Sequence, residues 1–238
     1  MRVSLKKIAG VFFFSAILLL TGCMYPGEEE GQGKIPYPEH VESIQRAVDA
    51  YQKESGGLLP IKTKDAETDK YIKYPIEFSK IVPNYTEKIP SSAYEKGGIF
   101  QYVLMDVEEN PTVKVVDLRA AEIIRDLNLR KSMNGQVPFK DKIGDNVYEI
   151  DFETLGFKSP LTLGSPYSDA HLPVVVGGDG NFYIDYSIDL NRILSEENPE
   201  IRAGEDIRFL LEEGSVVVPA YSLPYTVNEN NEPIFMAK

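Results

Sequence analysis

The sequence predicts an α+β fold in which helices alternate with antiparallel hairpins. Apolar residues recur at helical spacing in the segments 41–51 and 120–127, and strand-forming residues dominate the segments 99–107 and 172–176. Turn-forming residues follow these strands, so we expect each strand to fold back as a hairpin. Each helix and each hairpin has one apolar face that must be buried. We therefore expect each helix to pack on its hairpin, which gives two helix-plus-hairpin units, or three with a shorter C-terminal unit.

The first unit is expected over residues 39–118. Its helix begins near Pro38 and ends at Gly56-Gly57, and its apolar stripe has helical spacing: Val41, Ile44, Val48 and Tyr51. The charged segment 61–73 is expected to be a loop or a short strand. A strand, a turn and a returning strand then follow in order: 99–107, 108–111 and 112–118.

The second unit, expected over residues 119–201, repeats this order. Its helical stripe consists of Ala120, Ile123, Ile124 and Leu127. Pro138 follows Gly135 by three positions, as Pro60 follows Gly57, and a hairpin is expected around the turn 177–180. The shorter third unit, 202–238, has a helix that ends at Gly214 and then a hairpin. The sequence leaves open whether this order is an internal duplication or a recurring local pattern.

The first 22 residues have the organisation of a secretory signal. Three basic residues precede an apolar run over 8–20: Arg2, Lys6 and Lys7. The run closes on Leu20-Thr21-Gly22-Cys23, which resembles the lipobox of bacterial lipoproteins. This resemblance implies cleavage before Cys23 and a diacylglyceryl group on its thiol. The alternatives are a chance cysteine at a cleavage site and an uncleaved anchor, although the run is shorter than the roughly 20 residues that span a bilayer. Cys23 is the only cysteine of the chain.

Residues 23–38 are expected to form a flexible tether, because Gly, Pro and Glu dominate this segment. The chain has 238 residues, of which 37 are acidic and 25 basic, and its formal net charge is −12. Such a charge repels nucleic-acid phosphates and anionic lipid headgroups. We therefore expect no nucleic-acid partner, and we expect the lipid on Cys23 to hold the protein on the outer face of the cell membrane. The 42% hydrophobic content is enough for a packed core.

Two resemblances concern larger parts of the chain. The lipobox, the acidic tether and the helix start over 37–42 resemble the YphF-type lipoproteins of Bacillus and relatives, which implies a Gram-positive, extracytoplasmic, lipid-anchored protein and no particular activity. The helix 44–51 followed by Gly56-Gly57-Leu58-Leu59-Pro60 resembles the helix exit of type II secretion pseudopilins, which implies a pseudopilin-like helix and sheet in each unit. The prepilin-type cleavage site of that family is absent from this chain.

No catalytic, metal or cofactor site is expected. The two histidines, His40 and His171, belong to no zinc motif. Ser168 and His171 are the only local pair that could serve a hydrolase, and a turn explains them better than a triad does. The alternating acids of 65–69 have partial calcium-loop spacing, and Asp179 with Asp185 is a second candidate cation site. A tight hairpin turn accounts for Asp179 with fewer assumptions.

These observations favour a non-enzymatic binding or interaction module of the cell envelope. The alternative is the solute-binding lipoprotein of an ABC importer, although such receptors use βαβ lobes, whereas this chain predicts hairpins. An envelope hydrolase built on Ser168 and His171 is the third candidate.

Overall fold

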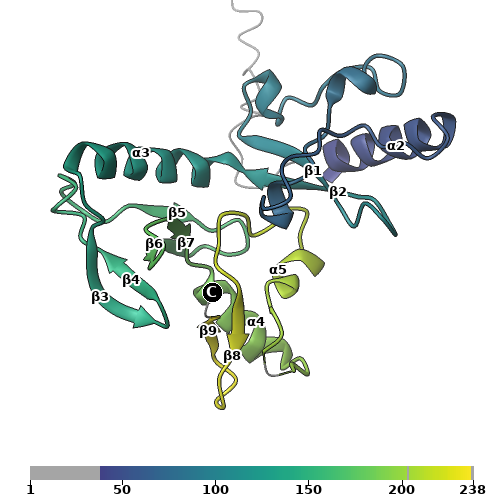
Figure 1. The fold of residues 1–238 in the computed structure, drawn as a ribbon. Coiled ribbons are helices and arrows are strands. Elements are labelled where there is room, and N and C mark those ends of the chain that lie inside the picture. Colours follow the sequence, from purple (N-terminus) through teal and green to yellow (C-terminus); the bar gives the residue numbers. More distant parts are fainter. Residues whose placement is uncertain (1–37, 203, 237–238) are drawn as a thin grey trace, which may run out of the picture.

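A computed structural model shows a mixed α+β fold and describes residues 38–202 and 204–236 (Figure 1). Within these ranges the chain forms four α-helices and several antiparallel sheets, so the predicted fold class of helices combined with antiparallel hairpins is confirmed. The predicted signal peptide, Cys23 and residues 24–37 of the predicted tether lie outside the described residues.

The N-terminal unit packs one helix on one hairpin. Its elements are α2 (Pro38–Glu54), β1 (Phe100–Met105) and β2 (Thr112–Asp117). The helix buries the expected stripe: Val41, Ile44, Ala47 and Val48. Gln45 fastens the helix to the hairpin, since the backbone N–H of Val113 donates to its amide oxygen at 2.7 Å. Gly56 and Gly57 follow the helix with φ of 72° and 96°, a backbone region that glycine adopts without strain.

Extended segments widen the β1–β2 hairpin at its first edge. Three short 3₁₀ turns lie between α2 and β1: η2 (Lys70–Ile72), η3 (Phe78–Lys80) and η4 (Tyr94–Lys96). Pro75 forms a bridge to Val103 of β1, and Ile76 in turn forms a bridge to Ile61. The N–H of Ile76 also donates to the carbonyl of Tyr102 at 2.9 Å. The segment expected to be a loop or short strand therefore contributes to the sheet.

The second edge of this sheet is covered by a distant part of the chain. Val217 forms a parallel bridge with Val115 of β2. The N–H of Val115 donates to the carbonyl of Val216 at 2.8 Å, and the N–H of Val218 donates to the carbonyl of Val115 at 3.0 Å. The C-terminal segment thus adds a short strand to the N-terminal unit, which the local sequence pattern did not predict.

The central unit places a helix beside a five-stranded sheet. The helix is α3 (Leu118–Asn134), which begins at the side-chain cap of Asp117 and ends at the left-handed Gly135. The sheet has the order β3-β4-β6-β5, and β7 pairs with β6. Its strands are β3 (Phe139–Gly144), β4 (Val147–Ile150), β5 (Thr162–Gly164), β6 (His171–Gly177) and β7 (Phe182–Ile184).

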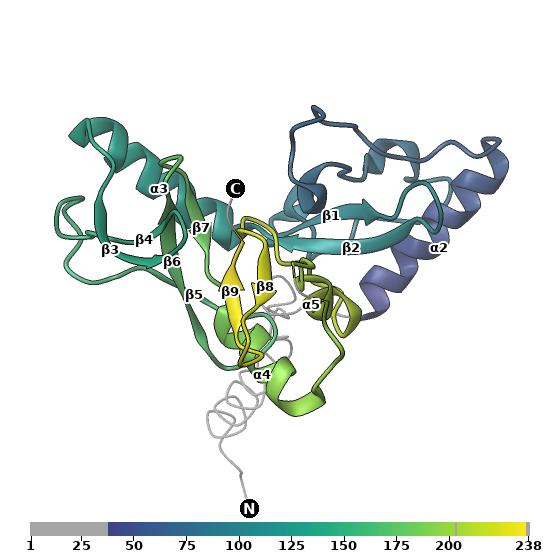
Figure 2. The same ribbon diagram turned by 60° about the horizontal axis from the view of Figure 1, so that its bottom comes forward.

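The C-terminal part contributes two helices and a hairpin: α4 (Ser187–Glu197), α5 (Phe209–Glu213), β8 (Tyr225–Val227) and β9 (Pro233–Phe235). The short helix and the hairpin are the predicted elements of the third unit. Figure 2 shows the N-terminal unit on one side, the central unit on the other, and the C-terminal elements between them.

The central unit differs from the single helix-plus-hairpin that the sequence suggested. The β3–β4 hairpin, β5 and α4 were not predicted, so this sheet has five strands, whereas the N-terminal unit has one hairpin with added segments. β3 was not predicted because most of its residues are exposed and half of its residues are charged. α4 follows β7 closely and has no side-chain cap at its start. The internal duplication stays a prediction.

Two main hydrophobic cores correspond to the two larger units. One core joins α2 to the β1–β2 hairpin and includes Val217 from the C-terminal segment. The other joins α3, the central sheet and α4, and it includes Leu210, Leu211 and Tyr225. The C-terminal segment therefore contributes to both cores. Among the described residues, no helix combines the length and the apolar composition that crossing a membrane requires.

Candidate functional site

A groove of about 680 Å³ lies where the start of α2 meets α4 and α5. Apolar side chains and prolines form much of its wall: Pro38, Pro166, Tyr167, Ile193, Leu210, Leu211 and Val216. Three charged residues, Arg192, Glu197 and Glu213, also line it. Pro38, the first residue that the structure describes, is one of the groove residues.

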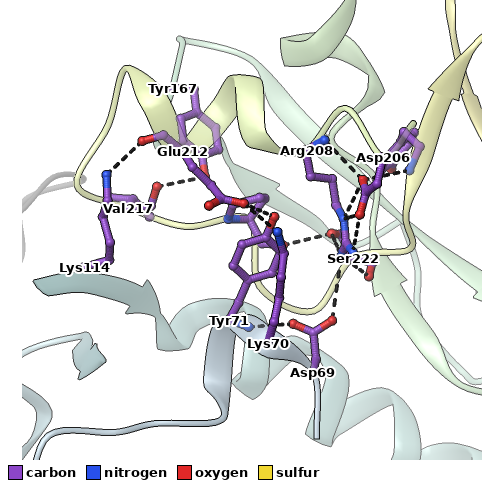
Figure 3. A network of polar contacts seen from close by, with 12 residues as sticks. Asp69, Lys70, Tyr71, Lys114, Tyr167, Asp206, Arg208, Glu212, Val217 and Ser222 are labelled. Atoms are coloured by element: carbon purple, nitrogen blue, oxygen red, sulfur yellow. Dashed lines mark hydrogen bonds and ion pairs between the residues drawn. The ribbon is translucent and has the colours of Figure 1, made fainter. Parts of the chain in front are cut away.

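Lys114 holds α5 at this groove. Its ammonium group, which extends from β2, donates to the carbonyl of Glu212 at 2.8 Å and to the carbonyl of Ser215 at 2.7 Å (Figure 3). A cation beside the last carbonyls of a helix satisfies acceptors that have no partner within the helix. Burial lowers the pKa of Lys114, because the charged form loses part of its hydration.

The carboxylate of Glu212 joins α5 to the N-terminal unit. It accepts a hydrogen bond from the hydroxyl of Tyr71 and forms an ion pair with the ammonium of Lys70 at 3.0 Å (Figure 3). Tyr71 lies in η2 and its side chain is fully buried. Burial raises the pKa of Tyr71, and the hydrogen bond to Glu212 raises it further. The tyrosine therefore stays protonated and remains a donor.

Arg208 forms a second polar link between the same parts of the chain. Its guanidinium pairs with Asp206 at 2.8 Å and with Asp69 at 3.7 Å, and it donates to the carbonyl of Ser222 at 3.2 Å. The guanidinium also lies over the ring of Tyr71, 5.1 Å from its centre. Arg208 is buried, so these contacts replace the water that its charge loses.

Tyr167 connects the groove to the added strand. Its hydroxyl donates to the carbonyl of Val217 at 3.2 Å, and its ring packs edge to face against Tyr186 at 5.9 Å. Burial raises the pKa of Tyr167, so this donor also stays protonated. The Tyr167 side chain therefore lines the groove and contacts both the added strand and the central unit.

The structure places Ser168 in a turn. Its hydroxyl donates to the buried carboxylate of Asp189 at 2.6 Å, and Ser165 donates to the other oxygen of the same carboxylate at 2.7 Å. The backbone N–H of Ala170 in turn donates to the Ser168 hydroxyl at 3.2 Å. His171 is exposed in β6, where it pairs with Gly164. These contacts support the turn interpretation of this segment.

The candidate cation sites have contacts that stabilise the fold. Asp69 caps η2 and pairs with Arg208. Asp179 accepts from the N–H of Asn181 at 3.0 Å within its hairpin turn, and Asp185 accepts from the hydroxyl of Tyr225 at 2.9 Å. In the part of the chain that the structure describes, no group of three or more His, Cys, Asp or Glu residues is placed to hold a metal ion. The second histidine, His40, contacts the hydroxyl of Ser92 at 3.1 Å.

Four residues that link the elements around the groove, without lining it, were not singled out from the sequence: Lys114, Asp189, Arg208 and Glu212. For each of them, at least one partner is more than ten residues away in the chain. One local signal exists, because Asp206 and Arg208 alternate beside the apolar stripe of α5. Once Arg208 is seen to be buried, this spacing is explained by a structural ion pair, because a buried arginine is usually paired.

Comparison with known proteins identifies the N-terminal unit. No curated protein and no solved structure matches this chain. Residues 37–117 match the YphF family N-terminal domain, which confirms the resemblance found in the sequence. The matched segment includes α2, β1 and β2, and it ends at the last residue of β2. The N-terminal part of this protein, over residues 37–117, is a YphF family N-terminal domain.

Proposed function

We propose that this protein is an extracytoplasmic lipoprotein that binds a protein or another envelope component without catalysing a reaction. The observation that carries the proposal is the groove of about 680 Å³ beside Pro38. If the lipid is attached at Cys23, the intervening tether has a root-mean-square reach of roughly 20 Å as a flexible coil. The groove is then held within a short distance of the membrane surface, where envelope partners are concentrated.

The composition of the groove suits a ligand that is part apolar and part charged. Leu210, Leu211 and Val216 offer apolar surface, whereas Arg192 and Glu213 bring charges of opposite sign to the same groove. Arg192 forms an exposed ion pair with Glu196 at 2.7 Å, and such a pair gives up little stability when a ligand replaces one partner. Binding sites commonly combine an apolar wall with a few polar groups that fix orientation.

The test compares binding by a groove variant with binding by a matched surface variant. Glu213→Arg reverses a charge at the groove, and Asp126→Arg makes the same charge change on the exposed side of α3. Captured envelope components are compared across the wild type and both variants. We expect Glu213→Arg to lose at least one component that Asp126→Arg retains. Equal capture by both variants would show that the groove is not the binding site.

A small-molecule screen by thermal shift separates this proposal from the solute-receptor alternative. A ligand that binds only the folded state raises the melting temperature. A compound that stabilises the wild type and Asp126→Arg but leaves Glu213→Arg unchanged would favour a solute receptor. Such a receptor is expected to have βαβ lobes with parallel strands, whereas the pairings among the described strands β1 to β9 are antiparallel.

A further inference from the structure

We propose that the β2 edge of the YphF N-terminal domain is a strand-binding site. Its ligand is a short, extended, valine-rich segment that pairs in the parallel direction, and in this chain the segment 215–220 supplies it. The family domain ends at Asp117, so the strand comes from outside the domain. The proposal does not depend on the binding groove.

Backbone hydrogen bonds define the site. On β2, Val115 uses both of its backbone groups: its N–H donates to the Val216 carbonyl at 2.8 Å, and its carbonyl accepts from the Val218 N–H at 3.0 Å. Val115 thus bonds the residue before Val217 and the residue after it, which is the hydrogen-bond pattern of a parallel ladder. The pairing ends at Val218, because its carbonyl, the next group that faces β2, accepts from the N–H of Ala220 at 2.8 Å.

Side chains of the strand enter both faces of the domain. Val217 is 1% exposed and lies in the core with α2 and Val115. Val218, also 1% exposed, lies in a separate cluster with Tyr71 and Val116. Successive side chains of the strand therefore enter pockets on opposite faces. In strand addition the backbone hydrogen bonds provide affinity, and such alternating pockets provide specificity. Without the strand, both pockets would be open to water.

Polar contacts fix the ends and the outer edge of the strand. Lys114 binds the carbonyls of Glu212 and Ser215 just before the paired residues. On the outer edge, the Ser215 hydroxyl accepts from the Val217 N–H at 3.0 Å, and the Val217 carbonyl accepts from Tyr167 at 3.2 Å. These caps occupy the backbone groups that a further strand would need, so the site takes one strand only.

The test removes one backbone hydrogen bond and then supplies the strand separately. Val218→Pro lacks the N–H that bonds Val115, whereas the matched control Val218→Ala keeps it. Hydrogen exchange is measured on the full chain carrying Cys23→Ala. We expect Val218→Pro to lower amide protection in α2, β1 and β2 by roughly ten- to a hundredfold relative to Val218→Ala. Protection in β6 and β7 serves as the internal reference and should change much less.

A peptide of sequence Gly-Ser-Val-Val-Val-Pro-Ala, corresponding to residues 214–220, should restore that protection when added to Val218→Pro. The same peptide with Asp at the central valine should not. Unchanged protection in Val218→Pro, or loss of protection that the peptide fails to restore, would overturn the proposal. Protection that depends on protein concentration, together with dimer formation, would show that a second copy supplies the strand and that the assignment to the same chain is wrong.

Discussion

The hydroxyl of Tyr71 donates a hydrogen bond to the carboxylate of Glu212, 141 positions further along the chain. Tyr71 belongs to the family domain and Glu212 to the short helix α5, so the bond joins two parts that the sequence separates. Lys70 pairs with the same carboxylate from the neighbouring position. The contact lies beside Arg208, whose guanidinium is over the ring of Tyr71, so both polar links meet at this junction (Figure 3).

Tyr71→Phe should lower the free energy of unfolding by about 1–3 kcal/mol, because a hydrogen bond to a charged acceptor is lost in a buried position. Urea unfolding followed by circular dichroism measures the change. Tyr94→Phe is the control, since the Tyr94 side chain is 65% exposed and its replacement should stay within about 0.5 kcal/mol. Equal effects of the two substitutions would contradict a structural role for the Tyr71 hydroxyl.

Arg208→Met should lower the free energy of unfolding by about 1.5–3 kcal/mol, the range for charge-assisted hydrogen bonds. The partial exposure of Asp206 and Asp69 keeps the loss below that of a fully buried pair. Arg125→Met provides the comparison, because the side chain of Arg125 is 76% exposed and its contact with Asp126 is 4.0 Å long. Thermal or urea unfolding of both variants checks the difference.

Ser168→Ala should reduce stability by about 1 kcal/mol, since the hydroxyl bonds Asp189 and the N–H of Ala170. Asp189→Asn should have a larger effect, because an amide nitrogen replaces one acceptor of two hydroxyl groups in a buried position. His171→Ala should leave stability nearly unchanged. A shared loss of any hydrolytic activity in Ser168→Ala and His171→Ala, at unchanged stability, would instead revive the hydrolase interpretation.

Stability should fall steeply at alkaline pH. Burial raises the pKa of several tyrosines in the folded chain, among them Tyr71, Tyr167, Tyr186 and Tyr225. Above about pH 10 the unfolded chain releases these protons while the folded chain keeps them. Ionisation therefore stabilises the unfolded state relative to the folded state. The contribution of these tyrosines to the free energy of unfolding is complete below about pH 10. Above that pH it decreases by about 1.4 kcal/mol per pH unit for each tyrosine. Urea unfolding at several pH values measures the slope, and Tyr71→Phe should reduce it.

Cys23→Ala should move the protein from the membrane fraction to the soluble fraction, because the predicted lipid has no other attachment site in a chain with one cysteine. Met24→Ala is the control, since it keeps Leu20-Thr21-Gly22-Cys23 intact. Detergent partitioning and immunoblotting of fractionated cells report the outcome. Retention of Cys23→Ala in the membrane at the wild-type level would show that another feature anchors the protein.

Elements with a clear local pattern could be predicted from the sequence. The apolar stripe of α2 and the glycines after it located this helix within a few residues, and the turn after β1 located the first hairpin. Strand β3 lacked such a pattern, because an edge strand can expose most of its side chains and still form a ladder with β4. Helix propensity alone gave α4 no clear start.

The candidate site was harder to predict, because its contacts are set by tertiary packing. Nothing near Lys114 indicates that its ammonium will bind the carbonyls of residues about 100 positions away. The valines at 216–218 favour an extended segment, but the parallel partner of that segment depends on how the two units pack. The turn at Ser168 was predicted, whereas its buried partner Asp189 lies in an element that the sequence did not reveal.

The contribution of Val217 to the first core has a consequence for the order in which the protein matures. A chain is made from its N-terminus, so the first domain is synthesised long before the residues that complete it. Its sheet edge stays unpaired until nearly the whole polypeptide has been delivered, and contacts this distant in sequence form slowly. A prematurely terminated chain would keep that edge and its apolar pockets exposed, and proteases would recognise it as incomplete.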